Sequence, residues 1–291
     1  MDTSFGQAEK KLRISRNIEP KEMAGDMISY QQILKFEKGQ TMISAEKLIY
    51  LLEFLNISLD EYERARHAIY GDSEIFYNQR IERALHHKDK AKLRVLLKET
   101  KEYMEEFPHN FHYFINMIEI KVALLKLNVR LKIPQKEIIK LSRHLLMIKE
   151  WTISDILIFS NCMEIFNESQ LKELVSRMLY PESRYLFSPQ TQSKMNLSLL
   201  KVINIFIKRK DYSQICELFS YLDEHIQSDL STSERALLAY NKNLFDYCQA
   251  PSIKQLMKLK QFVSTFELLG CYDIANVIAE EINHYQVNFL S

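Results

Sequence analysis

Glycine and proline are scarce in this chain. Only five Gly and six Pro occur in 291 residues. The few Gly leave no room for a phosphate-binding loop or a dinucleotide fingerprint, and no G-x-S-x-G nucleophile elbow occurs. Leu, Ile, Lys, Glu and Met are abundant instead, which favours long helices joined by short connections. The composition predicts an all-α protein and gives no support to an enzyme.

Cysteine, apolar runs and net charge are also limited. The four cysteines have no paired spacing, which is typical of a reducing cytoplasm, and no apolar run reaches the roughly 20 residues of a membrane span. His109 and His112 could share a helix face, but they have no third ligand nearby, so we expect neither a metal nor a cofactor. The net charge of +1 gives no strong field for a polyanion. We expect a cytoplasmic protein without a signal peptide or membrane contact.

The segment 23–39 carries the most specific pattern. Ser29 stands where a helix N-cap would, and Gln32 three residues later completes a capping box. Gly39 falls where a helix ends, and Ile33 points inward. The outer positions carry side chains that can read base edges: Tyr30, Gln31, Gln32 and Lys35. This order predicts a helix-turn-helix whose recognition helix covers 30–38.

Further helical segments surround this motif. Short helices are predicted over 5–16, 20–25 and 45–55 and from residue 59, and the first strong break comes at 70–72. We therefore expect a five-helix DNA-binding domain over residues 1–70. Longer helical segments follow, and helix pairs begin about 40 residues apart, near 169, 211 and 251. This period predicts a right-handed solenoid of tetratricopeptide-like (TPR-like) hairpins over 71–291, with an irregular helical bundle as the alternative.

Several short segments together resemble one known family. They are Leu12-Arg13, Met23-Ala24, Ile28-Ser29, Gln32-Ile33 and Phe36-Glu37-Lys38-Gly39 near the start, with Trp151 and Ile158-Phe159-Ser160-Asn161-Cys162 later. With them, the chain resembles the Rgg/GadR/MutR class of transcriptional regulators from Gram-positive bacteria over nearly its whole length. The resemblance implies a lambda-repressor-like helix-turn-helix domain joined to a peptide-sensing repeat domain. It also implies a cytoplasmic homodimer, since members of this class are homodimeric and many answer short re-imported peptides.

The resemblance assigns roles to individual residues. Tyr30, Gln31 and Lys35 match positions that contact bases, and the positions nearer the phosphates are Ser29, Gln32, Arg13 and Lys38. Asn161 matches a position that faces an extended peptide, and Glu164 lies one turn later, where several relatives carry Arg. Arg80 matches a basic position near the pocket entrance. An interhelical hydrogen bond is the structural alternative for Asn161.

These patterns predict a sequence-specific transcriptional regulator. It would bind a roughly palindromic site in double-stranded DNA as a homodimer, under the control of a short signalling peptide in the concave face of the repeats, as in quorum sensing. The near-neutral charge and a carboxylate at Glu19, close to the expected DNA surface, leave open a helical-repeat adaptor without DNA binding. A pH-responsive or constitutive regulator of the same fold is a third possibility.

Overall fold

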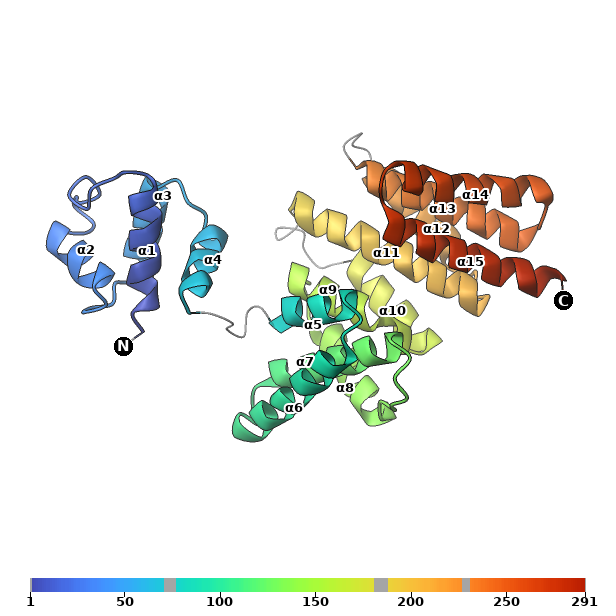
Figure 1. Ribbon diagram of the computed structural model, residues 1–291, viewed down its shortest axis with the longest axis horizontal. Coiled ribbons are helices and arrows are strands. Elements are labelled where there is room, and N and C mark those ends of the chain that lie inside the picture. The colour runs from blue at the N-terminus through green and yellow to red at the C-terminus, as the bar shows by residue number, and fades with distance from the viewer. Residues whose placement is uncertain (1, 71–76, 181–187, 227–230, 291) are drawn as a thin grey trace. The chain divides into compact units, whose positions relative to one another are not determined.

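The computed structural model describes residues 2–70, 77–180, 188–226 and 231–290. Contacts divide the chain into two compact units, Met1–Leu96 and Leu97–Ser291, and every regular element in the described ranges is helical, as predicted (Figure 1). The expected domain boundary at 71–72 lies outside the described residues. Within the described ranges, no helix is long and apolar enough to cross a membrane, and no cluster of three His, Cys, Asp or Glu side chains is arranged to hold a metal ion.

The first unit is built on four short helices around one core. They are α1 (Ser4–Ser15), α2 (Tyr30–Glu37), α3 (Ala45–Phe54) and α4 (Leu59–Tyr70), followed by α5 (Tyr77–His86). Met23, Ile33, Leu51 and Tyr62 are fully shielded from solvent in this core. Tyr62 also donates a hydrogen bond of 3.0 Å to the carbonyl oxygen of Phe5, so α4 is tied to α1. The predicted recognition helix is therefore held against a well-packed support.

The helix predicted over 20–25 is absent from the structure. The backbone there forms turns, in which the amide of Glu22 donates to the carbonyl of Glu19 and the amide of Ala24 to that of Lys21. Gly25 then donates to the carbonyl of Ile28. The first two bonds join each amide to the carbonyl three residues earlier, as in a turn, and not to the carbonyl four residues earlier, as in an α-helix. The turns still carry Met23 into the core, so the connection keeps the packing expected of the missing helix.

The second unit is a stack of helical hairpins. Its elements are α6 (Lys90–Glu106, which begins in the first unit), α7 (Phe111–Lys126), α8 (Gln135–Met147), α9 (Ile153–Cys162), a 3-10 turn (Met163–Ile165), α10 (Glu168–Leu179), α11 (Pro189–Arg209), α12 (Ile215–His225), α13 (Thr232–Gln249), α14 (Ile253–Leu268) and α15 (Tyr272–Leu290). Helices α7, α9, α11 and α13 pack on one another in that order, and α8 packs on α10. The hairpins thus form two layers, as in helical-repeat proteins. Figure 1 shows the last helices, in orange and red, packed beside one another.

One continuous apolar core joins the hairpins of the second unit. Trp151 lies in this core, and its indole Nε1 donates a hydrogen bond of 3.1 Å to the carbonyl oxygen of Leu145. Its ring packs against Phe159 with the ring centres 5.5 Å apart. Because both its ring and its N–H are used inside the core, Trp151 is a packing residue at the start of α9.

Candidate nucleic-acid interface and repeat-domain sites

Helix α2 begins with the predicted capping box. The hydroxyl of Ser29 accepts a hydrogen bond of 3.3 Å from the amide of Gln32, and the Gln32 side-chain oxygen accepts one of 3.2 Å from the amide of Ser29. At the other end, Gly39 has a φ of +67°, the left-handed conformation that glycine adopts without strain. Both ends of the helix are therefore fixed by local chemistry, as the sequence predicted.

The outer face of α2 is polar and open to solvent. Ile33 and Phe36 are buried on the inner face. The exposed side chains are those predicted to lie toward DNA: Ser29, Tyr30, Gln31, Gln32, Lys35 and Lys38. A helix that exposes amide, phenol and ammonium groups on one face has the dimensions and the hydrogen-bond donors needed to enter a major groove.

Lys47 belongs to the same surface, although it was not predicted from the sequence. Its ammonium donates a hydrogen bond of 3.3 Å to the side-chain oxygen of Gln32, so α3 brings a cation to the first turn of α2. Lys47 is the third residue after Ser44, whose hydroxyl accepts a hydrogen bond from the Lys47 amide and caps α3. That cap was visible in the sequence, but the contact between α3 and α2 was not.

Arg13 does not reach toward DNA. Its guanidinium is buried and forms two hydrogen bonds with the carboxylate of Glu37, at 2.7 and 3.1 Å, and a third of 2.6 Å with the carbonyl oxygen of Ile18. Arg13 therefore has a role inside the first unit in place of the predicted phosphate contact, because its guanidinium is enclosed there. The bidentate pair instead fastens α1 to the C-terminal end of α2.

A second carboxyl group is buried beside this ion pair. Glu9 lies on α1, one turn before Arg13, and is fully shielded from solvent. Burial, together with the nearby Glu37 carboxylate, raises the pKa of Glu9 to about 8, and the Arg13 cation opposes the shift only in part. Glu9 is therefore mostly protonated at neutral pH, whereas Arg13 and Glu37 form the charged pair.

In the repeat domain, Asn161 forms an interhelical hydrogen bond. Its side-chain amide donates a hydrogen bond of 2.9 Å to the carboxylate of Glu119 on α7. The ammonium of Lys126 donates a hydrogen bond of 3.3 Å to the backbone carbonyl oxygen of Asn161, and it lies 3.9 Å from the carboxylate of Glu164. The structure thus brings Asn161 and Glu164 around one lysine. Arg80 lies on α5 in the first unit and is half-buried.

The bond of Asn161 belongs to a series of polar contacts along the layer of odd-numbered helices. Each contact joins residues 38 to 42 positions apart in the sequence, which matches the predicted period of about 40 residues. The pairs are Asn161 with Glu119, Lys201 with Ser160, Asn196 with Glu234, Asn241 with the carbonyl of Leu200, and Tyr240 with Glu281. These bonds therefore join successive helices of the layer, because each donor finds its acceptor on a neighbouring helix.

Together, the fold and the exposed recognition helix define a helix-turn-helix DNA-binding protein with a helical-repeat domain. Comparison with known families agrees: residues 10–62 match the helix-turn-helix family, and residues 93–280 match the family described as HTH-type transcriptional regulator Rgg, C-terminal domain. The chain belongs to the Rgg family. It is a DNA-binding transcriptional regulator and not an enzyme.

Solved structures share the same fold over nearly the whole chain. The SHP pheromone receptor Rgg2 of Streptococcus dysgalactiae is 20% identical with a TM-score of 0.78, and the match covers 97% of this chain and 99% of that one. A transcriptional regulator from Listeria monocytogenes EGD-e is 16% identical with a TM-score of 0.79, covering 98% of both chains. PrgX in complex with iCF10 is 17% identical with a TM-score of 0.71, and the match covers 96% of this chain and 95% of that one.

The alternative of a helical-repeat adaptor without DNA binding is wrong, since the family to which the chain belongs is one of DNA-binding regulators.

Proposed function

We propose that the protein binds a two-fold symmetric DNA site as a homodimer, with α2 of each protomer in a major groove. The observation that carries this proposal is the exposed face of α2. Tyr30, Gln31 and Lys35 are its base-reading side chains, while Ser29, Gln32 and Lys38 lie toward the phosphates. Lys47 is a further residue that would contact a phosphate, because it lies beside Gln32. Because the net charge is only +1, affinity depends on these local contacts and on the two linked half-sites.

Base and phosphate contacts predict different responses to substitution. Gln31→Ala is expected to cost about 1–3 kcal/mol at one base-pair position and to relax the preference there. Lys38→Ala is expected to weaken binding to all sequences alike and to reduce the slope of log affinity against log salt by about 1. Fluorescence anisotropy with the selected site and its single-base variants, at four salt concentrations, separates the two. Equal loss on every sequence for Gln31→Ala would contradict its role in base reading.

We further propose that a short signalling peptide controls this DNA binding, as in quorum sensing, from the concave face of the repeats. Two findings support the idea: the Rgg2 structure is that of a pheromone receptor, and another similar fold is that of a bacterial peptide pheromone/receptor complex. In this chain the accessible polar groups of Asn161 and Glu164 lie around Lys126, and this cluster would offer donors and acceptors to a peptide backbone. A peptide acts only if it favours one geometry of the dimer. The contact of Arg80 with an acidic group of the peptide stays a prediction, since Arg80 belongs to the first unit.

Peptide binding by Asn161 is tested against its structural role. Asn161→Ala removes the hydrogen bond to Glu119, and we expect it to weaken peptide binding by about 1 kcal/mol in calorimetric titrations with short, unmodified linear peptides. Asn241→Ala is the matched control, because its amide is buried in an interhelical bond to Leu200. Lower stability in both variants with unchanged peptide affinity in Asn161→Ala would contradict the contact. If the wild type binds no candidate peptide, regulation without a peptide replaces this proposal, and the DNA role stands.

A further inference from the structure

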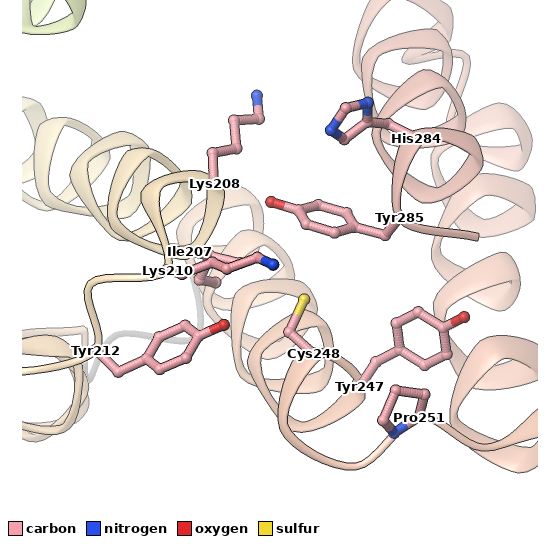
Figure 2. A pocket seen from close by; sticks show the side chains of 9 residues that line it. All are labelled: Ile207, Lys208, Lys210, Tyr212, Tyr247, Cys248, Pro251, His284 and Tyr285. Carbon is pink, nitrogen blue, oxygen red and sulfur yellow. The ribbon is translucent and has the colours of Figure 1, made fainter. Parts of the chain in front are cut away.

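The second unit contains a cavity at its C-terminal end. It lies between the end of α11, the loop that follows it, the end of α13 and the last turns of α15, and its volume is about 520 Å³. This size falls in the range of small-molecule sites, roughly 300–1,000 Å³. Figure 2 shows the side chains that line it, among them Lys210, Tyr212, Cys248 and Tyr285, whose polar ends point toward one another.

The charge at this cavity is positive. Lys208 is 3.1 Å from a carboxylate oxygen of Glu281, whose other oxygen accepts a hydrogen bond of 2.8 Å from Tyr240, so that carboxylate is already satisfied. Lys210 forms no ion pair with the part of the chain that the structure describes, and no carboxylate is among the described residues lining the cavity. Lys210 sits at the left-handed end of α11, with a φ of +58°, and its ammonium extends into the cavity (Figure 2).

The neutral polar groups of the cavity are donors. The hydroxyl oxygen of Tyr285 is buried without a hydrogen-bond partner in the described structure, and burial raises the pKa of its phenol, so the proton stays in place. Burial also raises the pKa of the Cys248 thiol to about 11, so the sulfur is uncharged at neutral pH. An unpaired hydroxyl in a buried position is costly, and an incoming acceptor would remove that cost.

The walls around these groups are apolar. The rings of Tyr212 and Tyr247 and the side chains of Ile207 and Pro251 line the cavity. The ring of His284 packs edge-on against that of Tyr285, with the ring centres 5.5 Å apart. A ligand that fits this arrangement needs an anionic end for Lys210 and the Tyr285 hydroxyl, and an apolar body for the walls.

We propose that this cavity binds an organic carboxylate with an aromatic or aliphatic body. Such a group can be the C-terminal residue of a peptide or a free carboxylic acid, and the two share the same chemistry at Lys210. The proposal does not depend on peptide binding at Asn161, because it concerns a different set of side chains. It adds to the proposed regulator a second ligand site, formed by α11, α13 and α15.

Cys248 reports directly on the electrostatics of the cavity. In the full-length protein, alkylation of each cysteine by iodoacetate, an anion, and by iodoacetamide, its neutral analogue, is followed by peptide mass spectrometry. We expect Lys210→Gln to lower the iodoacetate-to-iodoacetamide rate ratio at Cys248 about three- to fivefold, the effect of one unit charge a few ångströms away. The ratio at Cys216, which is exposed outside the cavity, should stay constant in the same molecules. Lys194→Gln, at the other end of α11, is the matched charge control and should change neither ratio.

Competition distinguishes the two sources of the carboxylate. The probes are 3-phenylpropanoate and an N-acetylated tripeptide ending in Phe, each compared with its carboxamide. Protection of Cys248 by one of the carboxylates but not by its amide, lost in Lys210→Gln, supports the proposal and identifies a free acid or a peptide end. Equal protection by acid and amide, no protection by either carboxylate, or an unchanged rate ratio in Lys210→Gln would overturn it.

Discussion

Gly6→Ala is expected to unfold the first unit and abolish DNA binding. A Cβ on Gly6 would lie 1.8 Å from the carbonyl oxygen of Phe36 and 2.5 Å from its carbonyl carbon, because α1 crosses α2 at this point. These are backbone atoms, so no rotamer change relieves the clash. The helices must separate, which moves the recognition helix on its support. We expect a loss of about 3 kcal/mol or more in the stability of this unit, at the upper end of overpacking effects.

The loss of stability expected for Gly6→Ala is opposite in sign to the usual effect of this substitution in a helix. A Gly→Ala change inside a helix normally stabilises it by about 0.5–1 kcal/mol, so a neutral or stabilising result for Gly6→Ala would contradict the close crossing. Gln7→Ala, at the exposed neighbouring position on α1, is the control and should change stability by less than about 0.5 kcal/mol. Hydrogen exchange of α1 and α2 measures the first unit. Fluorescence of Trp151, the one tryptophan of the chain, reports on the second unit and should be unchanged.

Glu9→Gln is expected to stabilise the first unit at neutral and alkaline pH but not at acid pH. In the folded protein the pKa of Glu9 is raised from 4.5 to about 8, so the unfolded chain releases this proton at lower pH than the folded one. The stabilising contribution of the neutral carboxyl is therefore complete below about pH 4.5 and is lost as the pH rises through about 8. Within that window the loss has a slope of up to about 1.4 kcal/mol per pH unit.

Glutamine keeps the shape of the neutral carboxyl but does not ionise, so the variant lacks this part of the pH dependence. The advantage of Glu9→Gln over the wild type should grow from about pH 4.5 and level off above about 8. Hydrogen exchange in α1 and α2, compared between the two proteins at the same pH, measures it. Glu53→Gln removes an exposed carboxylate on α3 and should give a nearly constant, small difference. A constant difference for Glu9→Gln as well would show that Glu9 is ionised in the fold.

Local sequence signals predicted the helices and their ends well. The capping box of Ser29 and Gln32 forms as expected, and the helix predicted from residue 59 begins with a similar box formed by Ser58 and Glu61. These motifs act over three residues, so the sequence alone contains the whole interaction. The prediction of a helix over 20–25 was wrong because a Pro at a helix start is only a weak signal. Turns satisfy the backbone there instead.

Contacts between distant residues could not be predicted in the same way. Arg13 was predicted to contact a phosphate from the family resemblance, but its partner Glu37 lies 24 residues away and only the fold brings them together. For Asn161, an interhelical hydrogen bond was one of the two predicted alternatives, but its partner Glu119 lies 42 residues away and could not be named from the sequence. The cavity beside Lys210 has no sequence signal, because its lining comes from three helices and two loops.

Selection of DNA from a random pool tests the central claim most directly. The full-length wild type and a Gln31→Ala, Lys35→Ala double variant are compared at the same salt concentration, since both side chains are exposed on α2 and neither supports the core. We predict that the wild type enriches one two-fold symmetric motif, with half-sites about one helical turn or a multiple of it apart, and that the double variant does not. Enrichment of the same motif by both proteins would show that α2 does not read the bases, and a motif without two-fold symmetry would contradict the symmetric homodimer.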